Sequence, residues 1–287
     1  DAKSDFYTSQ KYFTDDLRGT FAAMPGDKRI QGYINNRYPS AAVNYDESMK
    51  HLRETYAKPV FSFEVGQFEV LPDFDELEEF HGISDPANLR LIQEKAEKLG
   101  LMKQWKRYVE ATGEISRIGY REEVEAAMRT EDMSGISLLG LQDFPGQGTA
   151  LVGMINSHME SKPFDFAKPE HFASFFRAQL PLVALPKYTY EVGETLEAEV
   201  RIANYGKEDL TGPVTYCLEG ADVKQWRTSG SYVSGRRNHS SWKDSYRSGS
   251  DSTGCATGSC RRTSRYLQSV SDLGISGGQT GLPGWSI

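Results

Sequence analysis

The sequence predicts an α/β fold followed by a smaller antiparallel β module, and three observations lead to this prediction. In residues 1–184, two short apolar runs alternate with longer segments of helical period. Residues 185–223 change to a period of two, with polar residues at every second position. Residues 224–287 sustain neither period. We therefore divide the chain into three regions, 1–184, 185–223 and 224–287.

The first region carries the α/β pattern. The apolar runs at residues 58–64 (KPVFSFE) and 135–143 (GISLLGLQD) predict buried strands. Helical spacing predicts helices at residues 45–56, 85–99, 101–113 and 121–129, and another from 169 onward. Asp85 is the expected N-cap of the second helix, and Gly100 and Gly113 are expected to end the second and third. Strands that alternate with helices predict parallel pairing under a helical layer.

The pattern of the second region predicts antiparallel strands with one buried and one solvent-exposed face. Leu196, Ala198, Val200 and Ile202 alternate with charged residues, and Val214, Tyr216 and Leu218 alternate again after a turn. Antiparallel strands that follow an α/β segment indicate the start of a separate Ig-like β-sandwich module at residues 185–223.

The third region is a low-complexity tail of different composition. Residues 224–287 are rich in Ser, Gly, Arg and Thr and contain no Glu, Phe or Met. One alternative is a disordered tail, and the other is a segment out of the native reading frame. We favour the second, because the sandwich needs several more strands and the sequence stops supplying them. The pairs Arg236-Arg237 and Arg261-Arg262 lack the interleaved aromatic residues of an RNA-binding surface.

Composition excludes several classes of function. A net charge of -7 and a pI near 5.4 argue against nucleic-acid binding, and no apolar stretch approaches the length of a membrane span. The three cysteines, Cys217, Cys255 and Cys260, lack the usual zinc partners, so unpaired thiols are expected rather than a metal site. No GxSxG or HExxH motif accompanies the histidines. We expect no metal and no cofactor.

The end of the first apolar strand carries the first candidate site. Glu64 closes the strand, and the carboxyl ends of parallel strands are where α/β barrels hold catalytic groups. A carboxylate at the end of an apolar strand must be paired, hydrogen-bonded or shifted in pKa. Gly66 lets the backbone turn, and Gln67 is placed to reach a ligand. The plain alternative is a Glu that ends a strand in solvent.

The end of the second apolar strand carries the other candidates. Gln142 and Asp143 follow it, and such side chains suit vicinal sugar hydroxyls, while Phe144 can stack on a sugar face. The Gly-rich loop that follows permits close approach of a ligand. It is not a phosphate-binding loop, because it lacks both the GK[ST] ending and the GxGxxG spacing. The alternative is that Asp143 caps a turn and Phe144 lies in the core.

Three stretches resemble a bacterial branch of glycoside hydrolase family 2. They are PVFSFEVGQFEVLPDF, YREEVEAAMRT and GISLLGLQDFPGQGTALVGMINSHMESK, and the resemblance extends from about residue 18 to 218. It implies the C-terminal part of a (β/α)₈ barrel, with residues 58–64 and 135–143 as strands seven and eight. The rest of such a barrel is expected upstream of Asp1, since two strands cannot close it.

The resemblance also implies a function. Glu64 falls where the family carries its nucleophile, for retaining hydrolysis of an oligosaccharide or glycoside, a β-galactoside being the commonest substrate. The general acid/base belongs to an Asn-Glu pair on the fourth strand, which this chain does not contain. Two alternatives stay open: a non-catalytic carbohydrate-binding protein on the same barrel, and a fragment that is inactive alone. Localisation is left open for the chain, and a periplasmic or secreted location is expected for a full-length parent.

Overall fold

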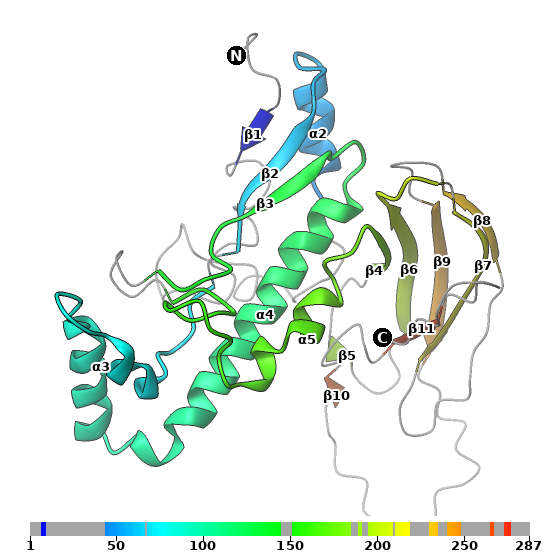
Figure 1. The fold of residues 1–287 in the computed structure, drawn as a ribbon. Helices are drawn as coiled ribbons and strands as arrows, with labels where there is room; N and C mark the ends of the chain where they lie inside the picture. Colours follow the sequence, from blue (N-terminus) through cyan, green and yellow to red (C-terminus); the bar gives the residue numbers. More distant parts are fainter. Residues whose placement is uncertain are drawn as a thin grey trace, which may run out of the picture. The chain divides into compact units, whose positions relative to one another are not determined.

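The structure is a computed structural model, and it describes residues 7–9, 44–66, 68–144, 151–184, 189–190, 195–208, 210–218, 230–234, 240–247, 265–266 and 273–276. The chain divides into two compact units (Figure 1). The first comprises Asp1–Asn35, Lys50–Ala127 and Met133–Phe176, and the second comprises Asn36–Met49, Met128–Asp132 and Arg177–Ile287.

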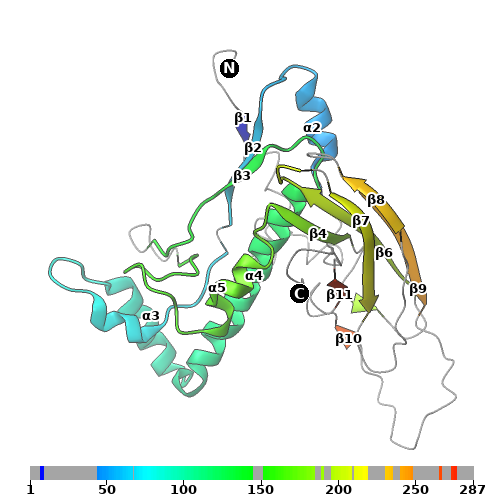
Figure 2. The ribbon, with the colours of Figure 1, turned by 45° about the vertical axis from the view of Figure 1, so that its right-hand side comes forward.

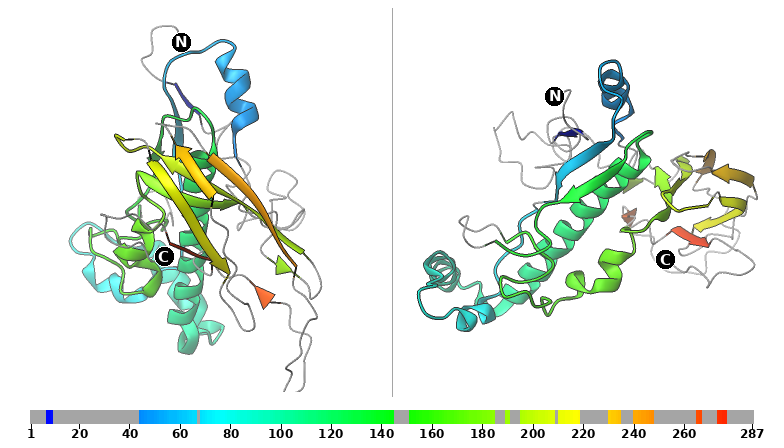
Figure 3. Two further views of the ribbon diagram at one scale, coloured as in Figure 1. Left: turned by 90° about the vertical axis from the view of Figure 1, so that its right-hand side faces the viewer. Right: turned by 45° about the horizontal axis from the view of Figure 1, so that its top comes forward.

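A parallel sheet forms the centre of the first unit. Strands β1 (Tyr7–Ser9), β2 (Val60–Val65) and β3 (Gly135–Leu138) lie in the order β1-β2-β3, and both pairings are parallel. The sequence prediction of two parallel strands is confirmed in β2 and β3, although β3 is shorter than predicted, and β1 was not predicted. Figure 3 shows the three strands side by side, with a long helix next to β3.

The two faces of β2 differ in burial. Val60 and Ser62 are fully buried, whereas Phe63 on the opposite face is 39% exposed. A strand alternates its side chains between the two faces of a sheet, so one face of β2 is covered and the other is accessible. The largest fully buried side chains of the first unit include Val65, Leu89, Tyr120, Phe166 and Phe175.

Several short helices and 3₁₀ turns precede or follow these strands in the chain. They are α2 (Asp46–Arg53), α3 (Ala87–Lys98), α5 (Pro169–Ala173) and the 3₁₀ turns η1 (Phe74–Glu79), η2 (Met102–Gln104) and η4 (Asp165–Ala167). Helix α3 begins at Ala87, and Asp85 forms an ion pair with Arg90 at 3.4 Å where we had predicted an N-cap. The predicted end at Gly100 is confirmed by its left-handed φ of +69°.

One helix replaces two that the sequence predicts. Helix α4 (Trp105–Arg129) runs for 25 residues without a break, so the predicted end at Gly113 is wrong. A Cβ on Gly113 would lie 2.1 Å from the Phe166 ring, and one on Gly119 would lie 2.6 Å from the Phe68 ring. Both glycines therefore serve close packing inside the helix, where a glycine costs only about 1 kcal/mol relative to alanine.

The second unit consists mainly of antiparallel strands. One sheet has the order β4 (Gln179–Ala184), β6 (Thr195–Asn204), β9 (Ser240–Arg247), which Figure 2 shows side by side. Another has the order β11 (Leu273–Ser276), β7 (Leu210–Leu218), β8 (Gly230–Ser234), and β10 (Arg265–Tyr266) pairs with β5 (Thr189–Tyr190). The predicted antiparallel strands are confirmed in β6 and β7. Because β4 pairs with β6, residues 179–184 belong to this unit, although we predicted the boundary after residue 184.

Strands β8, β9, β10 and β11 lie in residues 224–287, for which the sequence predicts disorder or a foreign reading frame. The register of β9 on β6 places Trp242 opposite Val200 and Tyr246 opposite Leu196. The structure thus differs from the expected disorder at these four strands, because a neighbouring strand supplies a partner that the local sequence does not reveal. The reading frame stays a prediction, since strand pairing does not test it. Within the described ranges, no helix combines the length and the apolar character that a membrane crossing requires.

Candidate functional site

Glu64 occupies a bulge at the end of the central strand. The register of β2 on β3 runs Phe63↔Ser137 and then Val65↔Leu138, so Glu64 is the extra residue between the two pairs. Its φ of +56° lies in the left-handed region, which a residue with a side chain seldom adopts. Bulges are rare in parallel sheets and often lie next to active sites, where they redirect a side chain.

The bulge changes which residue takes the buried face. Regular alternation from Val60 and Ser62 would put residue 64 on the covered face. Val65 takes that face instead and is fully buried, while Glu64 is half-buried. The register shift therefore removes the Glu64 carboxylate from the face that its position in the sequence would assign to it.

Helix α4 holds the chain that follows the bulge. Glu123 accepts a hydrogen bond from the Gly66 amide at 2.5 Å, and Ser116 donates to the Phe68 carbonyl at 2.8 Å. Thr112 accepts from the Leu71 amide at 3.1 Å. These positions on α4, 112, 116 and 123, lie near one stripe of the helix because an α-helix turns once in 3.6 residues. The segment 66–71 is thus fastened to α4 at three points.

Tyr120 belongs to the same stripe and connects the ends of both strands. A Cβ on Gly66, which has a φ of +112°, would lie 2.1 Å from the Tyr120 ring, so the glycine permits this contact. The Tyr120 hydroxyl lies 2.6 Å from the Gly140 carbonyl and 2.7 Å from the Val152 carbonyl. Tyr120 therefore packs against the end of β2 and bonds to the segments on either side of the β3 loop.

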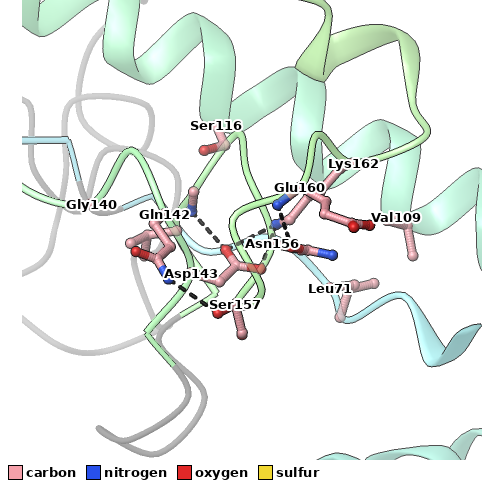
Figure 4. A network of polar contacts seen from close by, with 12 residues as sticks. Leu71, Val109, Ser116, Gly140, Gln142, Asp143, Asn156, Ser157, Glu160 and Lys162 are labelled. Atoms are coloured by element: carbon pink, nitrogen blue, oxygen red, sulfur yellow. Dashed lines mark hydrogen bonds and ion pairs between the residues drawn. The ribbon is translucent and has the colours of Figure 1, made fainter. Parts of the chain in front are cut away.

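Asp143 lies in the interior and is engaged within the protein. It is 3% exposed, and its carboxylate oxygens lie 2.9 Å and 2.8 Å from the Lys162 ammonium group. One oxygen also accepts a hydrogen bond from the Gly153 amide at 2.8 Å. Figure 4 shows Asp143 beside Lys162. These contacts join Asp143 to residues 10 and 19 positions later in the chain. A contact between Asp143 and a sugar stays a prediction.

The other predicted binding residues have different environments. Gln142 is half-buried and donates from Nε2 to the Ser157 carbonyl at 3.1 Å (Figure 4). Phe144 is 57% exposed, so it is not the core residue of the alternative. Gln67 and the loop at residues 145–150 lie outside the described residues. Glu64 is the next-to-last residue of β2, whereas Gln142 and Phe144 come four and six residues after the end of the parallel neighbour β3.

Two further buried carboxyl groups share the environment of Lys162. Burial raises the pKa of Glu76 to about 7, the Lys162 ammonium group opposes this rise, and the carboxylates of Asp143, Asp73 and Glu79 add to it. Burial also raises the pKa of Asp73 and that of Asp143, and Lys162 again opposes both shifts. Lys162 is itself buried, so its ammonium group compensates negative charge that water does not reach.

Asn156 organises the segment next to this cluster. Its side-chain oxygen accepts hydrogen bonds from the His158 amide at 3.0 Å and from the Glu160 amide at 2.9 Å. Figure 4 shows Asn156 beside Glu160, and the Nδ2 of Asn156 donates to Glu79 at 3.4 Å. His158 also lies near Glu79, with Nε2 3.8 Å from a carboxylate oxygen. Among the described residues, no group of three or more His, Cys, Asp or Glu side chains is arranged to hold a metal ion.

Sequence reasoning missed Tyr120, Glu123, Glu76 and Lys162. The spacing of Thr112, Ser116, Tyr120 and Glu123 would have revealed a polar stripe on one continuous helix. The predicted helix end at Gly113 hid this stripe. No local pattern distinguishes Lys162 or Glu76 from a surface residue, because their burial depends on segments distant in the chain.

Comparison with known proteins adds no assignment to this geometry. No protein-family model matches the chain, and no curated protein matches it.

Proposed function

We propose that the chain carries the nucleophile-bearing strands of a retaining glycosidase, with Glu64 as the nucleophile. The observation that carries the proposal is the left-handed bulge at Glu64, at the carboxyl end of the central parallel strand. A left-handed residue with a side chain costs on the order of 1–3 kcal/mol and persists where the surroundings enforce it, which is common at active sites. Here the strained backbone conformation occurs at Glu64, which is the residue that the family resemblance implies as the nucleophile.

The order of the sheet supports a barrel as the parent fold. Strands β1, β2 and β3 are parallel and lie in their sequence order. Neighbours along the chain are neighbours in the sheet of a (β/α)₈ barrel, whereas a doubly wound sheet reverses its order at a switch point. Helix α4 lies between β2 and β3 in the chain, as a crossover helix does.

In the proposed reaction, the Glu64 carboxylate attacks the anomeric carbon and a glycosyl-enzyme ester forms while the glycosidic bond breaks. A second carboxylic acid protonates the leaving oxygen and then, as a base, takes a proton from the water that hydrolyses the ester. The resemblance assigns that second group to an Asn-Glu pair, which this chain does not contain. We therefore expect the chain alone to be inactive and the activity to belong to a longer parent.

A carbohydrate-binding protein without catalysis is the second candidate, and the exposure of Phe144 favours it. An aromatic ring 57% exposed beside the half-buried Gln142 offers a stacking face and an amide, which are the groups that a sugar engages. This function requires neither Glu64 as a nucleophile nor a second carboxylate.

Labelling of the nucleophile distinguishes the two functions. A 2-fluoro glycoside slows hydrolysis of the covalent intermediate, so the full-length parent should gain one glycosyl group, and peptide mass spectrometry should locate it on Glu64. Glu64→Gln keeps the shape of the side chain and should abolish both labelling and most turnover. Glu78→Gln is the matched control, because Glu78 is exposed on η1. A sugar that binds without any label, or a label on another carboxylate, would contradict Glu64 as the nucleophile.

A further inference from the structure

We propose that Glu123, supported by Tyr120, is the positioning residue that sets which face of the sheet Glu64 occupies. The inference rests on the proposed function for its catalytic meaning, but its structural part stands on the contacts around the bulge. Glu123 is 1% exposed and lies on α4, 59 residues after Glu64 (123 − 64) in the chain. It acts on the backbone of the bulge and is not itself a catalytic group.

A hydrogen bond at Gly66 joins the residue after the bulge to helix α4. The Gly66 amide donates to a buried carboxylate oxygen of Glu123 at 2.5 Å. A hydrogen bond inside a protein is electrostatically stronger than the same bond in water. Glu123 therefore supplies a buried acceptor directly after the bulge, where the backbone turns away from β3.

Two residues with left-handed backbone conformations lie at the bulge, and the second of them donates this hydrogen bond. Glu64 has a φ of +56° and Gly66 a φ of +112°, with Val65 paired to Leu138 between them. Without the bulge, β2 would continue in its regular alternation and residue 64 would share the covered face with Ser62. Fastening Gly66 to Glu123 stabilises the alternative register, in which Val65 is the buried residue.

Tyr120 provides the second constraint on the same turn. Its ring lies where a Cβ of Gly66 would be, and its hydroxyl lies within hydrogen-bond distance of the Gly140 and Val152 carbonyls. The end of β2 is thereby held against the segment that carries Gln142 after β3. Positioning of this kind has catalytic weight, because a displacement of about 1 Å can lower a rate on the order of 10²-fold.

The structural part is tested by nuclear magnetic resonance on the 287-residue chain. Glu123→Leu removes the acceptor, and Glu123→Gln keeps the shape and a neutral acceptor. The Gly66 amide proton should resonate downfield and exchange slowly in the unmodified chain. It should move upfield in Glu123→Gln and lose its protection in Glu123→Leu. The Glu64 Cα and Cβ shifts should leave the left-handed range in Glu123→Leu.

Glu122→Gln is the control for burial of a changed side chain on α4. Glu122 is as buried as its neighbours and pairs with Arg121 at 3.2 Å, so its change should leave the Gly66 and Glu64 resonances in place. If Glu64 keeps its left-handed shifts in both Glu123 variants, the positioning role is overturned. If Glu122→Gln has the same effect as Glu123→Gln, the effect is one of general destabilisation, and the proposal is likewise overturned.

Kinetics of the full-length parent tests the catalytic meaning separately. Glu123→Gln should lower kcat about 10-fold with little change in KM, because it disturbs the attack on the anomeric carbon more than substrate binding. Glu123→Asp should restore part of the rate. If Glu64 loses its left-handed shifts in Glu123→Leu but is never labelled by the 2-fluoro glycoside, the proposed function fails while the positioning of the backbone stands. If kcat falls while the Glu64 shifts stay unchanged, the positioning inference fails.

Discussion

At the scale of the residue, burial decides the chemistry of the acidic side chains. Glu76 and Glu78 are neighbours on η1, yet Glu76 is buried near Lys162 and Glu78 is exposed. Burial raises the pKa of Glu76 to about 7, so ionisation of this carboxyl group is costly near its buried position. Burial raises the pKa of Asp143 as well, although the Lys162 ammonium group and the Gly153 amide oppose this rise.

The first prediction concerns the pH dependence contributed by Glu76. Its folded-state pKa of about 7 lies above the ordinary value of 4.5, so the folded chain binds more protons than the unfolded chain between these values. The free energy of unfolding should therefore fall as pH rises from 4.5 to 7, by up to about 3 kcal/mol, and stay low above pH 7. Glu76→Gln should flatten this part of the curve, as measured by urea unfolding at several pH values.

The exposed neighbour provides the control for that experiment. Glu78→Gln should leave the pH dependence of the free energy of unfolding nearly unchanged, because the exposed Glu78 side chain contacts water in the folded chain as it does in the unfolded chain. An identical slope in Glu76→Gln and the unmodified chain would contradict the buried, proton-binding state of Glu76.

The second prediction concerns the Tyr120 hydroxyl. Tyr120→Phe keeps the ring against Gly66 but removes the donor from the Gly140 and Val152 carbonyls. Loss of a hydrogen bond to a buried acceptor should lower the free energy of unfolding by about 1–3 kcal/mol, measured by chemical denaturation. Tyr108→Phe on the exposed side of the same helix should change it by less than about 0.5 kcal/mol. Equal changes in the free energy of unfolding for Tyr120→Phe and Tyr108→Phe would contradict a stabilising hydrogen bond from the Tyr120 hydroxyl.

At the scale of the element, α4 combines two tasks. Its glycines admit the rings of Phe166 and Phe68, and its polar stripe holds the segment after β2. A helix interior favours alanine over glycine, so the glycines reduce the intrinsic helix propensity and gain close packing in return. Helix α4 therefore contributes both to the core and to the arrangement of the segment that follows Glu64.

The third prediction reverses the usual effect of a Gly→Ala change. In an exposed helix such a change stabilises by about 1 kcal/mol, but at Gly113 the new methyl group would lie 2.1 Å from the Phe166 ring. Gly113→Ala should therefore lower the free energy of unfolding by about 1–3 kcal/mol. Combining it with Phe166→Leu, which shortens the opposing side chain, should recover part of the loss relative to the sum of the two single changes. Stabilisation by Gly113→Ala alone would refute this packing.

At the scale of the whole molecule, each unit depends on partners that are distant along the chain. In the second unit, β6 lies between β4 and β9, and its pairing with β9 extends from Thr195↔Arg247 to Ile202↔Ser240. In the first unit, the pairing of β2 with β3 and the bond from the Gly66 amide to Glu123 join segments that are 57 or more residues apart in the chain.

The fourth prediction concerns the role of β9. Removing residues 240–287 should expose one edge of β6, so the β6 amides that bond to β9 should lose protection while the alternate amides that bond to β4 keep it. Hydrogen exchange measured residue by residue reports both sets. Unchanged protection throughout β6 would favour the alternative that residues 224–287 do not belong to the native reading frame.

Sequence periodicity by itself determined where several elements lie. The apolar runs located β2 and β3, the period of two located β6 and β7, and Gly100 ended α3 as predicted. It succeeded there because these signals are local: a period states which face is apolar, and a left-handed position favours glycine. It also placed Glu64 at a strand end, which is a property of the segment alone.

Only the tertiary structure decided the bulge at Glu64, the continuity of α4, and the pairings of Glu123 with Gly66 and of Lys162 with Asp143. Each depends on a partner far along the chain, such as the Phe166 ring that occupies the space beside Gly113. Local propensities differ by about 1 kcal/mol per residue or less, whereas burying a ring or a charge pair involves several kcal/mol. Where the two conflict, packing therefore determines the outcome, and the sequence pattern does not reveal which distant residue will supply it.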